Sequence, residues 1–379
     1  MKKKINHILP ALVLTASLGL TTVSCNGFLD EMPDNRTELN TDQKIAKLLV
    51  SAYADVSPNE LFELYSDNSD DSGPTYGYYK LSEQECYHWQ DTKEEYQDTP
   101  NSLWGGYYSA IAAANMALNA IEEKGNPASL DPQRGEALVC RAYCHFMLAN
   151  IFCNAYDTHA SQSLGVPYME EVETTVSPRY ERGTLEEVYR KVERDLLEGI
   201  DLISDDSYSV PKYHFTRKAA YAFAARFYLY YMKPDFSNCD RVIDFATRVL
   251  GTNPADLLRN WEALGNLSVN GNVQADAYIA SSNEANLLIS STVSNWGAIG
   301  SDYLIGPRYF HNQTLATSET CLSSGLWGSS DYFYLKPFST NGFVASILRK
   351  SGLYEGTYLY YMPVLFSTDE TCLLYTSDA

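Results

Sequence analysis

Cys140, Cys144 and His145 lie close together in one segment and are residue types that could hold a metal. Thiolate and imidazole groups are ligands that Zn²⁺ prefers. The chain has no C-x-x-C pair of the kind typical of zinc and redox sites, and cysteine is common as a small apolar residue inside helices. Core packing explains the same spacing. The sequence therefore predicts no metal and no cofactor here.

An acidic run over residues 67–73 resembles the start of a calcium-binding loop. Such a loop places a bidentate Glu at its twelfth position. The twelfth residue counted from Asp67 is Tyr78, which cannot serve in that role. We therefore expect a solvated loop.

The chain lacks the common catalytic motifs. We find no G-x-S-x-G elbow, no H-E-x-x-H, no P-loop and no G-x-G-x-x-G. The 48 acidic residues supply many carboxylate pairs, but nothing in the sequence positions two of them as a glycosidase acid and base. We expect a protein that is not an enzyme.

Aromatic residues are the unusual feature of the composition, with 30 Tyr, 14 Phe and 5 Trp. Many lie in two stretches without long helical patterns, residues 57–101 and 252–363. Long irregular connections usually carry function, and the flat C–H faces of sugars stack on aromatic rings. We expect these stretches to face a ligand, and the candidate binding residues are Trp89, Trp296, Trp327, Tyr76, Tyr78 and Tyr332. The alternative for each Trp is a ring packed in the core.

The remaining elements are helices joined by short linkers, over residues 41–56 and 102–251. Ser102 is the expected N-cap of one helix, Asp131-Pro132 opens the next, and Thr184 with Glu187 forms a capping box. Thr216 caps a further helix, and a last one ends at Gly251. Their contact faces are rich in Ala, which suits close helix packing. The pattern predicts a mainly α fold of stacked tetratricopeptide-like helical hairpins with a looped, irregular ligand-binding region.

The overall charge limits the function. The 379 residues include 28 Lys and Arg against 48 Asp and Glu, a net charge of −20. So acidic a chain is repelled by nucleic acid. A 45% apolar and 20% charged composition also excludes general disorder.

The N-terminus has the layout of a secretory signal. Three lysines, Lys2 to Lys4, precede a short apolar run over residues 8–20. The following Thr22-Val23-Ser24-Cys25 resembles a bacterial lipoprotein box. We expect residues 1–24 to be a lipoprotein signal peptide and Cys25 to be lipidated; the alternative is an ordinary signal with an incidental Cys.

Several motifs together resemble a known family. Residues 25–30, Cys-Asn-Gly-Phe-Leu-Asp, followed by Pro33, are similar to the start of the SusD/RagB family of nutrient-binding outer-membrane lipoproteins. Later matches, in family order, are Trp104, Tyr108, Ile111, Ala114, Asn115, Glu136, Ala137, Arg141, Ala142, Tyr143, Gly165 to Tyr168, Tyr189, Asp195, Leu196, Lys218 to Ala220, Ala224, Arg226, Tyr228 and Leu229. They cover most of residues 25–250.

The resemblance implies a single SusD-like domain over residues 25–371, tethered by lipid on the cell surface. It implies a protein that binds oligosaccharides and delivers them to a partner TonB-dependent (SusC-like) outer-membrane transporter. Two alternatives stay open. One is peptide capture for the same kind of uptake. The other is a helical-repeat scaffold that docks a protein and no nutrient, which predicts that Trp89, Trp296 and Trp327 are buried.

The last residues point to an artefact. Residues 364–371 resemble the lead-in to another family helix, but its usual continuation is missing. Residues 372–379, Cys-Leu-Leu-Tyr-Thr-Ser-Asp-Ala, match the translation of a common transposase sequencing-adapter junction. Our hypothesis is that these residues are an assembly artefact and that the protein continues past Thr371.

Overall fold

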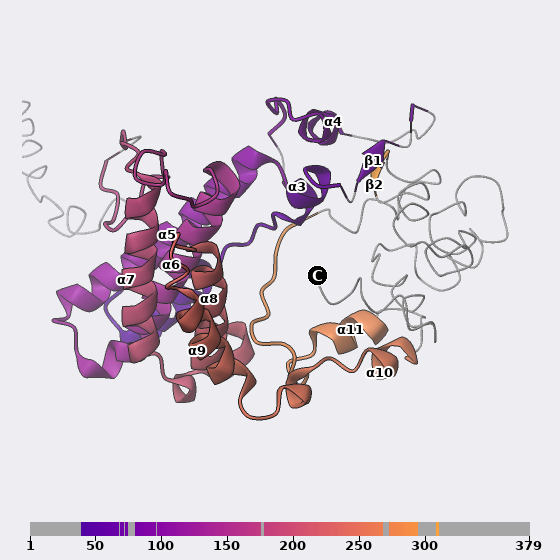
Figure 1. The fold of residues 1–379 in the computed structure, drawn as a ribbon. Coiled ribbons are helices and arrows are strands. Elements are labelled where there is room, and N and C mark those ends of the chain that lie inside the picture. Colours follow the sequence, from indigo (N-terminus) through magenta and orange to yellow (C-terminus); the bar gives the residue numbers. More distant parts are fainter. Residues whose placement is uncertain are drawn as a thin grey trace, which may run out of the picture. The chain divides into compact units, whose positions relative to one another are not determined.

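The computed structural model describes residues 39–294, apart from 68, 72, 75–79, 96, 176–177 and 268–272, together with 308–310. Its α-helices are α2 (Asp42–Leu49), α3 (Asn59–Leu64), α4 (Leu81–Tyr87), α5 (Pro100–Glu123), α6 (Asp131–Phe152), α7 (Leu185–Leu202), α8 (Arg217–Tyr230), α9 (Cys239–Leu250), α10 (Trp261–Gly265) and α11 (Val273–Ile279) (Figure 1). The 3₁₀ helices are η1 (Val50–Ala52), η2 (Ala128–Leu130), η3 (Asp205–Ser207), η4 (Pro211–Tyr213) and η5 (Pro254–Leu257). Two short strands, β1 (Asp70–Asp71) and β2 (Tyr309–Phe310), pair antiparallel.

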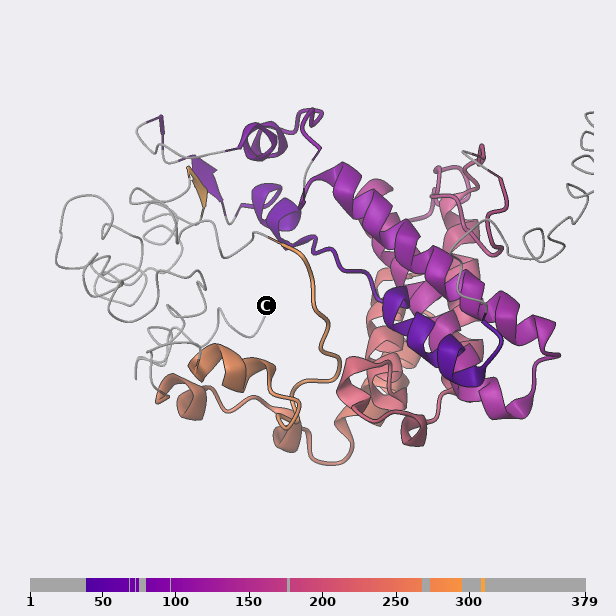
Figure 2. The same cartoon turned by 180° about the vertical axis from the view of Figure 1, so that it is seen from behind.

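The long helices pack in hairpins. Helix α6 lies between α5 and α7, α8 packs against α9, and α2 lies along α5 (Figure 2). Two glycines let α6 and α7 approach closely, because a Cβ on Gly199 would lie 2.8 Å from the carbonyl oxygen of Gly135. The expected mainly α fold of stacked helical hairpins is confirmed.

Local signals set several of the helix starts. Thr184 accepts from the Glu187 N–H over 3.2 Å, and the Glu187 carboxylate accepts from the Thr184 N–H over 2.9 Å, which completes the expected capping box. Thr216 caps α8 as expected. The expectation for Ser102 is wrong. Helix α5 begins three residues earlier in sequence with Thr99 as its N-cap, because Pro100 is preset for the first helical position.

Helix α6 is buried on almost all sides, and its cysteines belong to the core. Cys140 and Cys144 are buried free thiols. Burial raises the pKa of Cys144 to about 12, so this thiol stays protonated at neutral pH. Asp131 is the first helical residue of α6 rather than its cap, a position taken by Leu130.

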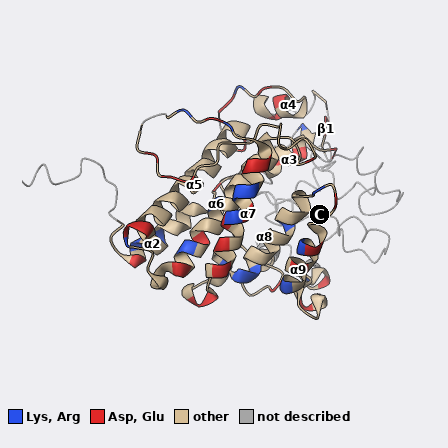
Figure 3. Cartoon of the chain, turned by 60° about the vertical axis from the view of Figure 1, so that its left-hand side comes forward, with Lys and Arg blue, Asp and Glu red and all other residues tan. Residues whose placement is uncertain are grey.

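Charged residues of both signs alternate over α7 and α9 (Figure 3). None of the helices in the described ranges is long and apolar enough to cross a bilayer.

Candidate functional site

An aromatic pair, a half-buried Tyr65 and an exposed Trp89, lies where α3 and α4 end. Tyr65 follows α3 directly, and Trp89 lies two residues after Tyr87, the end of α4. The two rings stack with centroids 4.4 Å apart and planes inclined by 19°. The Trp89 side chain is nevertheless 72% exposed. One indole face is supported by Tyr65, and much of the ring remains open to solvent.

The backbone holds Trp89 in an unusual conformation. Its φ is 57°, in the left-handed region that favours glycine. The Trp89 N–H donates to the Cys86 carbonyl over 2.9 Å, and the Gln90 N–H donates to the Glu85 carbonyl over 2.7 Å. These two bonds form a Schellman motif, the common end of a helix. A tryptophan there costs about 1–2 kcal/mol relative to glycine, so its side chain is a feature that the fold retains at a cost in stability.

A second aromatic cluster joins this region to residues 308–310. The Tyr87 and Tyr309 rings lie 4.7 Å apart. Arg308 donates from Nε and Nη2 to the two carboxylate oxygens of Asp71, each over 2.6 Å. These hydrogen bonds lower the pKa of Asp71. Asp71 of the acidic run is thus paired with a guanidinium.

The other predicted ligand-facing residues lie outside the described residues. These are Tyr76, Tyr78, Trp296, Trp327 and Tyr332. Cys25, the predicted lipidation site, also lies outside them. The structure therefore locates Trp89 alone among the six predicted binding residues.

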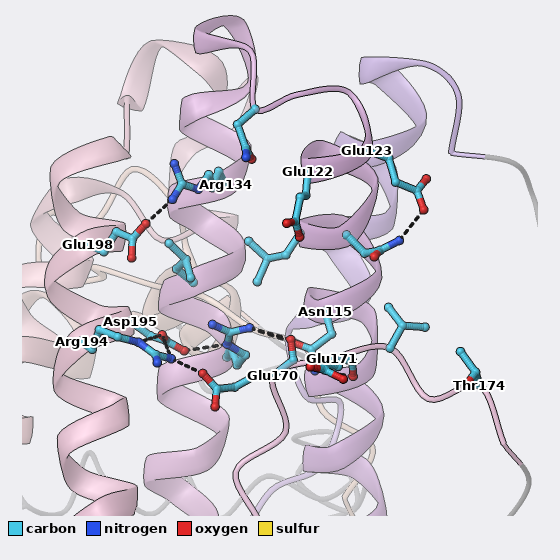
Figure 4. Close-up of a pocket in the computed structure, with 16 residues that line it drawn as sticks. Asn115, Glu122, Glu123, Arg134, Glu170, Glu171, Thr174, Arg194, Asp195 and Glu198 are labelled. Atoms are coloured by element: carbon cyan, nitrogen blue, oxygen red, sulfur yellow. Dashed lines mark hydrogen bonds and ion pairs between the residues drawn. The ribbon is translucent and has the colours of Figure 1, made fainter.

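The structure also contains a pocket that the sequence analysis did not predict. A cavity of about 870 Å³ opens between α5, α6, α7 and residues 170–174 (Figure 4). Carboxylate, guanidinium and amide groups dominate its lining. Within the described part of the chain, no group of three or more His, Cys, Asp and Glu side chains is placed to hold a metal ion.

A buried hydrogen-bond network forms the floor of this pocket. Arg141 of α6 donates from Nε to Asp195 of α7 over 2.6 Å and from Nη1 to the side-chain oxygen of Asn115 of α5 over 3.0 Å. The Tyr168 hydroxyl donates to the same Asp195 carboxylate over 2.7 Å. Three helices and the segment after α6 are thereby held in one arrangement, and the charge of Arg141 is paired.

His145 contacts two residues of this network, Arg141 and Tyr168. Its Nε2 accepts from the Met169 N–H over 2.9 Å, so Nδ1 carries the proton and donates to the Arg141 carbonyl over 2.9 Å. The ring stacks on Tyr168 with centroids 3.8 Å apart. Burial lowers the pKa of His145 to about 3. His145 is therefore a neutral structural residue.

One sequence signal could have indicated the floor. Asn115, Arg141 and Asp195 are polar residues on the apolar faces of three helices, and buried polar residues need partners. The sequence alone does not say that they partner one another.

Comparison with known proteins agrees with this fold. Residues 27–229 match a SusD-like family model described as starch-binding and associating with the outer membrane. No curated protein matches the chain.

Two solved structures similar to this chain come from Bacteroides vulgatus ATCC 8482. A SusD superfamily protein from Bacteroides vulgatus ATCC 8482 is 20% identical with a TM-score of 0.54, over 76% of this chain and 63% of its own. A proposed sugar-binding protein from the same organism is 17% identical with a TM-score of 0.51, over 86% and 87%. At these identities the likeness shows the fold.

A SusD superfamily protein from Bacteroides thetaiotaomicron VPI-5482 is 19% identical with a TM-score of 0.46, over 60% of this chain and 49% of its own. The chain thus spans about half to two thirds of the length of several such relatives. Because the family model matches more than half of the chain, the chain belongs to the SusD-like family.

Proposed function

We propose that this chain is a cell-surface lipoprotein that binds oligosaccharides and delivers them to a TonB-dependent outer-membrane transporter. The observation that carries the proposal is the exposed Trp89 ring stacked on Tyr65. Sugar rings present flat C–H faces that pack on such a surface. A ring already supported by a neighbour loses little side-chain entropy on binding.

The exposure of Trp89 also bears on the scaffold alternative. A scaffold that docks only a protein predicts a buried Trp89, whereas this side chain is mostly exposed. Membership of a family described as starch-binding supports glycan capture over peptide capture. The proposed function is binding without chemistry, with the chain attached to the outer membrane through lipidated Cys25.

Affinity electrophoresis and calorimetry with soluble α- and β-glucans test the binding. Trp89→Ala should lower the affinity for the bound glycan at least tenfold, and Tyr65→Ala should lower it less. Phe236→Ala is the matched control, because Phe236 is also an exposed aromatic residue with a φ of 57°. Unchanged binding by a folded Trp89→Ala variant removes this ring from the site.

The transporter partnership needs a separate experiment. Affinity purification of the lipidated chain from outer membranes should recover a TonB-dependent transporter. Recovery of the chain alone, from membranes in which it binds glycan, contradicts the delivery role and leaves the binding role intact.

A further inference from the structure

We propose that the pocket between α5, α6 and α7 is a second binding site, for a small organic cation that also carries a carbonyl or hydroxyl oxygen. This inference goes beyond oligosaccharide capture at Trp89. It rests on different residues, and either proposal can fail without the other.

The cationic side chains of the pocket already have partners. Arg194 pairs with Glu170 over 2.7 Å and with Asp195 over 2.6 Å, and Arg134 pairs with Glu198. Asp195 also takes the charge of Arg141. The guanidinium groups therefore offer little unbalanced positive charge to a ligand.

The carboxylates on the opposite side are not balanced in this way. Glu122 points from α5 into the pocket, and Glu171 lies near Asn115 (Figure 4). Among the described residues, neither carboxylate has a hydrogen bond or an ion pair. Glu123, beside them, accepts from the Asn119 side chain over 2.9 Å and has no cation. The lining has six carboxylates against three guanidinium groups, and its excess negative charge lies on this side.

Two further features favour a cation on the side of the pocket where Glu122, Glu123 and Glu171 lie. Helix α5 ends at Glu123, so the negative end of its dipole adds to the carboxylates. The nearest lysine in sequence, Lys124, makes an ion pair with Asp42 of α2 over 3.5 Å. An ammonium or guanidinium group from a ligand would supply the missing positive charge.

The floor supplies an unused donor. Arg141 is only 6% exposed and lines the pocket. Its Nε donates to Asp195, and its Nη1 donates to Asn115 and, over 3.4 Å, to the Glu170 carbonyl, while its Nη2 makes no hydrogen bond to any described residue. Since its charge is already paired, Nη2 suits a neutral acceptor such as a carbonyl or a hydroxyl oxygen.

The volume of the pocket and the residues that line it limit the class of ligand that it can bind. A volume of about 870 Å³ is within the range of small-molecule sites. None of the described residues that line it is aromatic, so it lacks the stacking surface that neutral sugars prefer. A basic amino acid within a peptide and an amino sugar both carry the required cation and oxygen.

Calorimetry on the full chain with matched small probes tests the proposal. Nα-acetyl-argininamide has a guanidinium and carbonyl groups. Nα-acetyl-citrullinamide lacks the charge, and butylguanidine lacks the oxygen. We expect the first to bind at least tenfold more tightly than either of the others. Equal affinity for the citrulline probe overturns the proposal.

Glucosamine and glucose form the second pair of probes and separate the two sources of the ligand. Tighter binding of glucosamine than of glucose indicates an amino sugar. Binding of the arginine probe without glucosamine indicates a basic peptide. Absence of binding by both cations overturns the proposal.

Two double variants test whether the cation binds in this pocket. The double variant Glu122→Gln with Glu171→Gln should weaken cation binding at least tenfold. The control is Glu95→Gln with Glu181→Gln, which removes the same charge from exposed residues outside the lining. Equal affinity of the two double variants contradicts the site. Glycan binding at Trp89 should be the same in both.

Discussion

Arg141 donates from Nε to Oδ2 of Asp195 over 2.6 Å in the interior of the helical hairpins, which joins α6 to α7 by a buried charge pair. Because both groups are buried, removal of Asp195 would leave the Arg141 guanidinium poorly hydrated and without a carboxylate partner. The pair therefore stabilises the arrangement of the helices more through what its loss would expose than through its own attraction.

Removal of Asp195 alone should be more harmful than removal of both members of this pair. Asp195→Leu should lower the free energy of unfolding by about 3–5 kcal/mol, because it leaves Arg141 charged and unpaired. Adding Arg141→Met should restore part of that loss. Urea unfolding followed by circular dichroism measures both. A double variant no more stable than the single variant contradicts this account.

The close approach of α6 and α7 should not tolerate a methyl group. A Cβ on Gly199 would lie 2.7 Å from Cγ2 of Val139 and 2.8 Å from the carbonyl oxygen of Gly135. Gly199→Ala should cost about 1–3 kcal/mol. Gly105→Ala in α5 is the control, since nothing lies within 4 Å of its Cβ. It should stabilise the protein by about 0.5–1 kcal/mol through helix propensity.

The backbone at Trp89 predicts an unusual ranking of two variants. Both Trp89→Gly and Trp89→Ala remove the ring, but only glycine adopts a φ of 57° without a steric cost. The glycine variant should be about 1 kcal/mol more stable than the alanine variant. Both should lose glycan binding equally. A more stable alanine variant would show that the left-handed conformation is not kept in solution.

Glu60 should make the protein less stable as the pH rises. Burial raises its pKa from 4.5 to about 8. The positive charge of Lys80, 3.9 Å away, opposes this rise, and the negative charges of Glu83 and Asp98 add to it. Between those values the folded protein holds a proton that the unfolded chain has released. The free energy of unfolding should therefore fall between pH 4.5 and 8, by up to about 1.4 kcal/mol per pH unit.

Glu60→Gln checks this slope. The variant should unfold with a weaker pH dependence over that window, and its advantage over the wild type should be greatest above pH 8. Chemical unfolding at a series of pH values gives both curves, and parallel curves would rule out a protonated Glu60.

His145 should have the opposite effect. Burial lowers its pKa from 6.5 to about 3, so between those values the unfolded chain binds a proton that the folded protein excludes. Its contribution is complete above pH 6.5 and is lost as the pH falls toward 3. His145→Gln keeps an acceptor for the Met169 N–H and should flatten this part of the stability curve. An unchanged acid slope in a folded variant would contradict the assignment.

The sequence by itself determined the helical scaffold. Caps such as Thr184 with Glu187 and Thr216, and apolar residues at helical spacing, act over a few residues and can be recognised without a fold. The same local signals misplaced the start of α5, because Thr99 and Ser102 are both good caps and the choice depends on Pro100. The family resemblance also depended on motifs visible along the chain.

Only the tertiary structure decided which polar residues meet. Asn115, Arg141 and Asp195 come from three helices and join in one network because those helices pack side by side. The stacking of Trp89 on Tyr65 likewise unites the ends of two short helices. Which side chains pair with one another depends on residues distant in sequence, and periodicity along one segment shows only which face of a helix is apolar.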